Sequence, residues 1–400
     1  MTCRFDEVID FSHSHLLKWE YPSPYLPHPA SRPPLPLWIA DMDFRCPDEV
    51  QQALHDAINQ GVFGYTRASE TLFDAIIQWQ WHHHGWRIHE DWIVQSPGVV
   101  NSLSMIVQTF TQPGEGVLIQ PPVYGPFYHS VTMNDRQVVT APLTETASGY
   151  TLDLDAFEQA ITPTTRLFFL CNPHNPTGHV WSRDELLAMG NICRRHGVMV
   201  VSDEIHQDLI INPAKRHQPF AGINDEFADH SITCTSPSKT FNLAGLHTSN
   251  LFIPNKTIRD ALKRTYARCS LYIPNMLGLA ACEAAYRHGG PWLSALLDYL
   301  RDNRALLQAN LGPDSPVRLF DADALYLGWL DFRESGIAPA DLPATLLNQA
   351  GLWLDDGAKF GAAYAGFARI NFACRRALLH SALAKLADMF TARGKTGGLV

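Results

Sequence analysis

The chain has 400 residues, of which 46% are hydrophobic and 18% are charged, and its formal net charge is −9. Length and composition predict a globular protein with a large hydrophobic core and two domains. The acidic balance argues against nucleic acids and anionic membrane surfaces as partners, because both attract a basic protein surface.

The sequence also argues against membrane insertion and secretion. No stretch reaches the roughly 20 apolar residues of a membrane helix, and the N-terminal MTCRFDEVIDF lacks the apolar core of a signal peptide. The eight cysteines are scattered without a C-x-x-C pair, which is typical of reduced thiols. These features predict a cytoplasmic protein.

The first predicted element is an extended arm. Seven prolines lie between Pro22 and Pro36. Because proline fixes φ and removes an amide donor, this segment cannot be helical. It is either a linker or an arm that covers a neighbouring domain or subunit.

Helical patterns follow the arm. Residues 48–60 place apolar side chains on one face, and Gly61 is positioned to end that helix. Residues 182–197 predict another helix, for which Ser182 and Glu185 form a capping box.

Short apolar runs predict the strands, at residues 116–120, 166–172, 197–204, 231–236 and 249–254. Helical patterns lie between several of them. This alternation favours an α/β fold in which a mainly parallel sheet is flanked by helices.

The pattern changes in the last third of the chain. Residues 292–311 predict a long helix, residues 325–332 a strand and residues 377–390 a final helix. We therefore expect a large cofactor-binding domain at residues 46–285, and a smaller α+β domain formed by residues 1–45 and 286–400.

Three predicted strands end in unusual polar groups. They lead into NPHNPTG (172–178), SDEIH (202–206) and SPSK (236–239). Ligands of such sheets bind at the C-terminal ends of the strands, so these segments predict one site. Each motif alone is also typical of a turn or a solvated loop; their number and order favour the site.

One end of this site suits a phosphate group. Gly98, Val99 and Val100 lie where a loop enters a predicted helix, and backbone amides at a helix N-terminus attract anions. Ser236 and Ser238 would add hydroxyl donors.

The remaining polar groups suit a pyridine ring with an aldehyde. Asp203 can hold a protonated ring nitrogen, since a buried charge persists only when it is paired. Asn175 and His206 can donate hydrogen bonds to a ring oxygen. Lys239 can form an imine, because partial desolvation lowers the pKa of an amine and makes it nucleophilic. Together these groups match pyridoxal 5′-phosphate (PLP).

The motifs also resemble those of a known family. NPHNPTG, SDEIH and SPSKTFNLAGL are similar, in the same order, to the asparagine, aspartate and lysine motifs of class I/II aminotransferases, the fold-type I PLP enzymes. The resemblance spans nearly the whole chain. It implies that Lys239 carries PLP as a Schiff base, that Asp203 pairs with the ring nitrogen, and that Asn175 contacts the ring oxygen and the substrate.

Further roles follow from the resemblance. Tyr124 takes the place of the aromatic residue that stacks on the ring, and Tyr65 that of the residue that reaches the phosphate in the other subunit. Both are implied as catalytic residues beside Lys239, in a homodimer with shared active sites. Arg369 and Ala40 are implied to bind the substrate, and an arginine suits a carboxylate because it can donate two parallel hydrogen bonds.

One branch of the family is more similar. LWIADMDF (37–44), SDEIHQDL (202–209), GGPWLSALLDYL (289–300) and LYLGWLDFR (325–333) resemble the cystathionine β-lyases, the MalY/PatB-type C–S lyases. That branch implies β-elimination of a small sulfur amino acid such as cystathionine, which yields a thiol, pyruvate and ammonia. Lys239 would remove the Cα proton, and Lys239 or Tyr124 would protonate the leaving thiolate.

Two departures from the aminotransferase pattern lower the expectation of transamination. Many aminotransferases have a phosphate-binding arginine where this chain has His247, and a tyrosine where it has His206. The alternatives are an aminotransferase and a non-catalytic PLP-binding regulatory protein. The regulatory alternative is disfavoured because this chain's start is short, proline-rich and not basic.

Other notable residues have structural explanations. Consecutive histidines on a helix point in different directions, so His82, His83 and His84 predict a solvated helix end and no metal site. Cys171 and Cys234 are expected to be buried small apolar residues.

Overall fold

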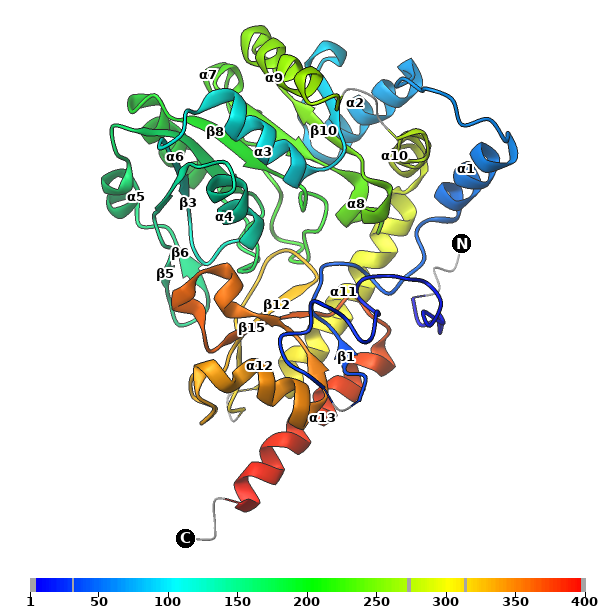
Figure 1. Cartoon of the computed structure of the whole chain (residues 1–400), viewed down its shortest axis with the longest axis vertical. Helices are drawn as coiled ribbons and strands as arrows, with labels where there is room; N and C mark the ends of the chain where they lie inside the picture. The colour runs from blue at the N-terminus through cyan, green and yellow to red at the C-terminus, as the bar shows by residue number, and fades with distance from the viewer. Residues whose placement is uncertain (1–4, 31, 272–274, 313–314, 397–400) are drawn as a thin grey trace. The chain divides into compact units, whose positions relative to one another are not determined.

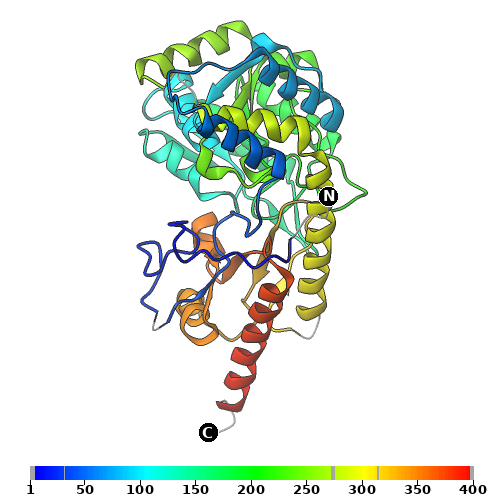
Figure 2. The same ribbon diagram turned by 90° about the vertical axis from the view of Figure 1, so that its right-hand side faces the viewer.

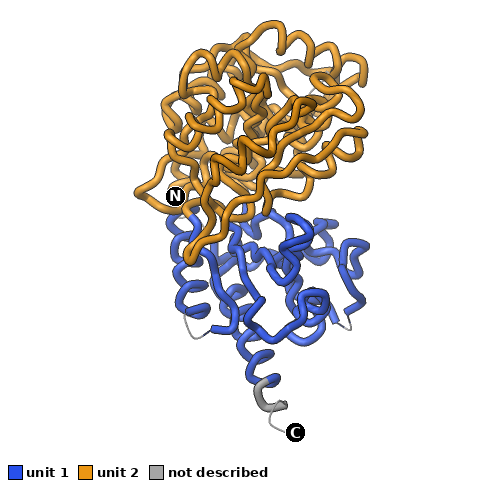
Figure 3. The backbone as a smooth tube through the Cα atoms, turned by 90° about the vertical axis from the view of Figure 1, so that its left-hand side faces the viewer, with its two compact units in different colours: residues 1–45, 295–322, 326–400 blue, residues 46–294, 323–325 orange. Residues whose placement is uncertain are grey.

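The chain divides into two compact units. The computed structural model describes residues 5–30, 32–271, 275–312 and 315–396. The large unit comprises residues 46–294 and 323–325, and the small unit comprises residues 1–45, 295–322 and 326–400 (Figure 3). The unit boundary falls inside helix α11 (Gly290–Asn310), nine residues beyond the domain boundary that we expect from the sequence at residue 285.

The large unit is built on a mixed sheet that is mostly parallel (Figure 1). Within the described residues it has seven strands in the order β2-β10-β9-β8-β7-β3-β4. The strands are β2 (Ile93–Ser96), β3 (Gly116–Ile119), β4 (Gln137–Thr140), β7 (Thr165–Cys171), β8 (Met199–Asp203), β9 (Ser231–Thr235) and β10 (Ser249–Phe252). The predicted α/β class with a mainly parallel sheet is confirmed.

The central strands are parallel, and parallel strands are usually covered on both faces because the helices that connect them pack there. β3, β7, β8 and β9 run parallel, whereas β10 runs antiparallel to both of its neighbours. Almost every residue of β7, β8 and β9 is buried, as expected for near-continuous apolar strands between layers of helices. The direction of β10 was not evident from the sequence, because an apolar run carries no sign of its direction.

Helices cover the sheet of the large unit (Figure 1). They are α1 (Asp48–Asn59), α2 (Glu70–His84), α3 (Val99–Phe110), α4 (Gly125–Thr132), α5 (Leu154–Ala160), α6 (Arg183–Arg195), α7 (Asp225–Asp229), α8 (Pro237–Thr240), α9 (Lys256–Arg268) and α10 (Met276–His288). α6 begins with the predicted capping box of Ser182 and Glu185. The short hairpin of β5 (Thr144–Glu145) and β6 (Tyr150–Thr151) completes the unit.

The small unit contains an antiparallel sheet in the order β11-β12-β15-β14. Its strands are β11 (Arg318–Leu319), β12 (Leu327–Asp331), β14 (Asp355–Asp356) and β15 (Phe367–Asn371), with α12 (Leu342–Thr345) and the C-terminal helix α13 (Arg376–Thr396, red in Figure 2). The predicted strand at 325–332 and helix at 377–390 correspond to β12 and α13.

The proline-rich arm ends in the small unit. β1 (Leu35–Pro36) pairs in parallel with β13 (Leu352–Trp353). The rings of Trp38 and Trp353 stack with their centroids 4.3 Å apart, which fixes the end of the arm. No helix in the described part of the chain is long and apolar enough to cross a membrane.

Gly190 on α6 tests the packing of the large unit. A Cβ atom built at this position would collide with the ring of Phe227 on α7. We expect Gly190→Ala to lower the free energy of unfolding by about 1–3 kcal/mol, because a well-packed core cannot accept the extra methyl group without shifting. Urea unfolding of the purified variant measures this change.

Gly290→Ala is the matched control. Gly290 is the first residue of helix α11, and apart from its chain neighbours and the backbone of its own helix, no described atom lies within 4 Å of a Cβ built there. The alanine should leave stability unchanged or raise it by up to about 1 kcal/mol, through helix propensity alone. Equal stability of the two variants would contradict the predicted overpacking.

Candidate active site

The sheet register brings the three polar motifs together. β7, β8 and β9 are parallel neighbours, and Asp203 at the end of β8 is paired with Cys171 on β7 and Cys234 on β9. The backbone amide of Asn172 donates to the carbonyl of Asp203 over 2.9 Å. The segments that follow these strands therefore leave the same edge of the sheet, as predicted for a ligand site.

Asp203 is a buried carboxylate with little local compensation. Asp203 is 4% exposed. In the described structure its side chain accepts one hydrogen bond, from the amide of Ile205 at 3.2 Å. Burial raises the pKa of Asp203 to about 7, while the Ile205 hydrogen bond and the positive charge of Lys239 oppose that rise. The site thus holds an acid that a cationic ligand would stabilise in its ionised form.

The neighbouring Glu204 is also buried but is fully engaged. Its Oε1 accepts from the Ser202 hydroxyl (2.8 Å) and the Phe220 amide (2.9 Å), and its Oε2 contacts His217 Nε2 at 2.9 Å. The hydrogen-bond partners of Glu204 therefore come from the protein itself, whereas Asp203 has fewer such partners among the described residues.

Asn175 and Tyr124 are joined through their backbones. The Tyr124 amide donates to the Asn175 carbonyl at 3.1 Å, and the Asn175 amide lies 3.3 Å from Cys171 Sγ. Asn175 is buried, and Tyr124 is half-buried at the start of α4. Cys171 and Cys234 are buried, which confirms the prediction, and burial raises the pKa of both thiols.

The N-terminus of α3 has backbone amides available for an anion. Gly98 precedes the helix with φ of 150°, a backbone conformation that other residues rarely adopt, and among the described residues no side chain caps α3. Val99 is buried and Val100 is partly exposed. These amides could hold an anion, because the first amides of a helix carry the positive end of its dipole, and the phosphate site stays a prediction.

Lys239 lies on the short helix α8. Ser236 caps that helix: its hydroxyl accepts from the Ser238 amide at 3.0 Å and lies 2.7 Å from the Thr248 carbonyl. This hydroxyl is therefore used within the protein, whereas Ser238 and Lys239 are half-buried. His206 is buried in the turn after β8. His247 is exposed and adopts a left-handed backbone conformation.

Tyr65 stands apart from this group. Its side chain is 97% exposed, on the irregular segment between α1 and α2, and Val62 and Phe63 beside it are exposed as well. Within the large unit, the fold does not bring Tyr65 into the buried site.

Arg369 and Ala40 belong to the small unit. Arg369 is buried on β15 and donates to Asp355 Oδ2 at 2.7 Å and to the Trp38 carbonyl at 3.1 Å. Lys359 donates to the other oxygen of Asp355 at 2.9 Å. Ala40 is buried, and its carbonyl accepts from the Tyr326 hydroxyl at 2.9 Å.

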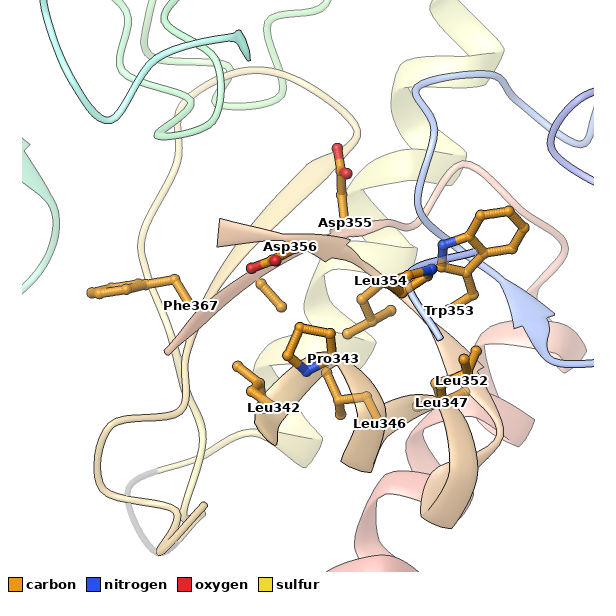
Figure 4. A pocket seen from close by; sticks show the side chains of 12 residues that line it. Leu342, Pro343, Leu346, Leu347, Leu352, Trp353, Leu354, Asp355, Asp356 and Phe367 are labelled. Atoms are coloured by element: carbon orange, nitrogen blue, oxygen red, sulfur yellow. The ribbon is translucent and has the colours of Figure 1, made fainter. Parts of the chain in front are cut away.

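The strand that carries Asp355 has two different faces. In Figure 4 the Asp355 carboxylate lies on the opposite side of the strand from Leu354. Apolar side chains line the pocket on that other side, mainly Leu342, Pro343, Leu346, Leu347, Leu352 and Leu354.

The prediction of a solvated histidine cluster was wrong for His84. The His84 side chain is 4% exposed, and its Nε2 lies 2.8 Å from Asp208 Oδ1. His83 instead stacks on Trp79 at 3.6 Å, and His82 is exposed. No group of three or more potential ligand side chains for a metal occurs among the described residues.

Comparisons with known proteins agree with this geometry. The model of the family "Aminotransferase class I and II" matches residues 33–386. Cystathionine beta-lyase PatB of Bacillus subtilis is 44% identical over 354 residues, which cover 88% of this chain and 91% of that protein. Among solved structures, PLP-containing cystalysin of Treponema denticola is similar with a TM-score of 0.93 and 32% identity, over 98% of this chain and all of that one.

A further solved structure is similar over most of the chain. It is the PLP-bound C–S lyase of Staphylococcus hominis, with a TM-score of 0.89, 31% identity, and coverage of 96% of this chain and 97% of that one.

The raised pKa of Asp203 predicts a pH-dependent stability of the protein without cofactor. Because the pKa rises from 3.8 to about 7 on folding, the folded state binds the extra proton. The stability that this proton contributes to the folded state is fully present below pH 4 and is lost as the pH rises through 7. Asp203→Asn lacks this titration. Cofactor-free Asp203→Asn should therefore be more stable than wild type at pH 8, by roughly 2–4 kcal/mol, with a difference that grows between pH 4 and pH 7.

Thermal or urea unfolding across this pH range measures the difference. The same substitution should weaken PLP binding, because it removes the predicted partner of the ring nitrogen. Greater stability together with weaker PLP binding identifies a functional carboxylate. Lower stability at pH 8 would instead assign Asp203 a structural role.

Proposed function

The chain belongs to the family of class I and II aminotransferases, and we propose that within this family it is a PLP-dependent C–S β-lyase. It cleaves the Cβ–S bond of sulfur amino acids such as cystathionine and releases a thiol, pyruvate and ammonia. The observation that carries this proposal is the Asp203 carboxylate, whose pKa burial raises to about 7, at the sheet edge of a chain 44% identical to a cystathionine β-lyase.

The large unit offers a matching group for each part of PLP. Asp203 would hold the protonated ring nitrogen, a cation that would stabilise the ionised form of this buried acid. Asn175 and His206 would donate to the ring oxygen, and Tyr124 would stack on the ring. The amides of Gly98, Val99 and Val100, together with Ser238, would hold the phosphate.

The proton transfers belong to Lys239. When bound, PLP supplies an electron sink for the charge that develops at the substrate Cα. Lys239 would take the Cα proton of the bound substrate as general base. Lys239 or Tyr124 then donates a proton to the departing sulfur, which makes the thiol a better leaving group. Asp203 remains ionised throughout and keeps the ring nitrogen protonated.

Substrate recognition rests on the small unit. Arg369 would bind the α-carboxylate, with Ala40 as a further contact. Asp355 accepts from both Arg369 and Lys359, so these three side chains carry a net charge of +1. The cluster therefore remains attractive to a carboxylate although Arg369 already has a fixed anionic partner. Asp355 also restricts the direction of the guanidinium, which suits binding of one defined carboxylate.

We further propose that the protein acts as a homodimer. Val62, Phe63 and Tyr65 expose 64–97% of their surface on one segment, which is unusual for three apolar or aromatic side chains so close together. A second copy of the chain would cover them, and Tyr65 would complete the phosphate site of that copy. The free cysteines also support the reducing cytoplasm as the location of the protein.

Product analysis tests the lyase reaction. With cystathionine and PLP but without a keto acid, we expect pyruvate and homocysteine in equal amounts. Lys239→Ala should reduce the rate by at least about a thousandfold, because it removes the general base as well as the imine. Lys256→Ala, an exposed lysine paired with Asp260 on α9, is the control and should retain full activity.

Other outcomes separate the alternatives. Turnover only with a keto acid would establish an aminotransferase, and PLP binding without turnover of either kind would establish a binding protein. A Lys239→Ala enzyme that keeps its lyase activity would contradict the assigned base.

The dimer can be tested by introducing a charge on the exposed segment. We expect Phe63→Asp to dissociate the protein, because a carboxylate in an apolar interface cannot be solvated. Sedimentation velocity measures the change in mass. Met133→Asp, at an equally exposed apolar position after α4, should leave the dimer intact. A monomeric wild-type protein, or a dimeric Phe63→Asp variant, would overturn this proposal.

A further inference from the structure

A third buried acid of the large unit, Asp208, has no part in the scheme above. Its side chain is 1% exposed. Among the described residues it accepts hydrogen bonds from Trp79 Nε1 (3.0 Å), His84 Nε2 (2.8 Å) and Thr240 Oγ1 (2.7 Å). Such a concentration of donors is characteristic of an ionised carboxylate that is held in place.

The charge state of Asp208 agrees with this arrangement. Burial alone would raise its pKa, but the hydrogen bonds and charge of His84, together with the hydrogen bonds of Thr240 and Trp79, hold the pKa of Asp208 below its usual range. The carboxylate therefore stays ionised at neutral pH. Hydrogen bonds to a charged acceptor are stronger and better fixed in direction than neutral ones.

The donors link Asp208 to the proposed anchor of the cofactor. Thr240 directly follows Lys239 on α8, and its hydroxyl forms the shortest of the three contacts. Asp208 itself lies in the turn after β8, a few residues beyond Asp203 and His206. One hydrogen bond thus joins the segment of the lysine to the segment of the ring-binding residues.

The remaining contacts of Asp208 connect it to helix α2. Trp79 and His84 both come from α2, and the Trp79 indole packs on the ring of Phe241, with a centroid distance of 5.5 Å. Phe241 follows Thr240, so α2 contacts two successive residues after Lys239, one directly and one through Asp208. α2 therefore acts as a rigid support behind α8.

A second connection leads towards Asp203. The His84 ring meets the His217 ring edge to face at 5.3 Å, and His217 Nε2 lies 2.9 Å from Glu204 Oε2. Glu204 directly follows Asp203. The two buried acids with full sets of donors, Glu204 and Asp208, thus lie on either side of the His206 turn.

We propose that Asp208 is a positioning residue, which acts through the Thr240 hydroxyl to fix Lys239 relative to Asp203 and His206. This inference rests on the proposed function. An amine that must form an imine and later reach the Cα proton has to be held within a narrow range of positions, and small displacements are costly in rate. Asp208 is linked to the segment that carries Lys239, so the hydrogen bond should govern the lysine steps rather than carboxylate binding.

The Thr240 hydroxyl allows a test that preserves the shape of the core. Thr240→Val replaces the hydroxyl with a methyl group, and Thr240→Ser keeps the hydroxyl. In the holoenzyme, we expect Thr240→Val to lower kcat roughly tenfold with KM for cystathionine changed less than about twofold. In the apoprotein, the same variant should form the imine with added PLP roughly tenfold more slowly, as measured by absorbance. Thr240→Ser should restore both rates to near the wild-type values.

A purely structural role gives a different result. If Thr240→Val lowers the unfolding temperature but leaves kcat and the rate of imine formation unchanged, the proposal is overturned. It is equally overturned if Thr240→Ser is as impaired as Thr240→Val. Asp208→Asn provides a second variant, and if folded it should show the same loss of rate as Thr240→Val.

Failure of the proposed function can be recognised separately. A wild-type protein that forms the imine but releases no pyruvate would disprove the lyase assignment. The comparison of imine formation between Thr240→Val and Thr240→Ser would still decide the role of Asp208.

Discussion

The proposed site depends on one physical constraint: a carboxylate at the buried end of β8 needs a positive partner. Asp203 has one hydrogen bond within the described structure, and burial raises its pKa to about 7. Such a group is costly for the protein alone, because a buried charge without compensation destabilises the fold. A protonated pyridine nitrogen removes that cost. The burial of Asp203, which destabilises the protein without cofactor, therefore favours binding of the cofactor.

Two nearby acids, Glu204 and Asp208, have no proposed ligand and accept their hydrogen bonds from the protein itself. Glu204 and Asp208 are buried as well, but their carboxylates accept from several hydroxyl, amide, indole or imidazole donors. The difference between these two residues and Asp203 lies in the number of donors, since all three are buried. The rigid surroundings also serve a purpose, because a site for covalent chemistry requires supporting residues that do not move.

The local features of this site were predictable from the sequence, and the long-range ones were not. The capping box of Ser182, the strands before each motif and the site residues on the large unit follow from short patterns and from a family resemblance. The role of His84 does not, because its partner Asp208 lies 124 residues away. Likewise, the Ser236 hydroxyl was expected to face a phosphate, and only the fold shows that it caps α8. The antiparallel direction of β10 depends on how the chain connects the strands, and the apolar sequence of one strand does not reveal this.

The division of the site residues between two units separates two chemical tasks. The residues proposed for proton transfer and cofactor binding lie in the large unit, and Asn175, Asp203 and Lys239 lie at or after parallel strands that are buried on both faces. The residues proposed for the α-carboxylate lie in the small unit, where Arg369 is held by Asp355. Every amino acid carries an α-carboxylate, so Arg369 cannot select for sulfur. Selectivity for the leaving group must therefore come from residues that contact the Cβ substituent, while Lys239 and its support through Asp208 can serve any group that leaves from Cβ.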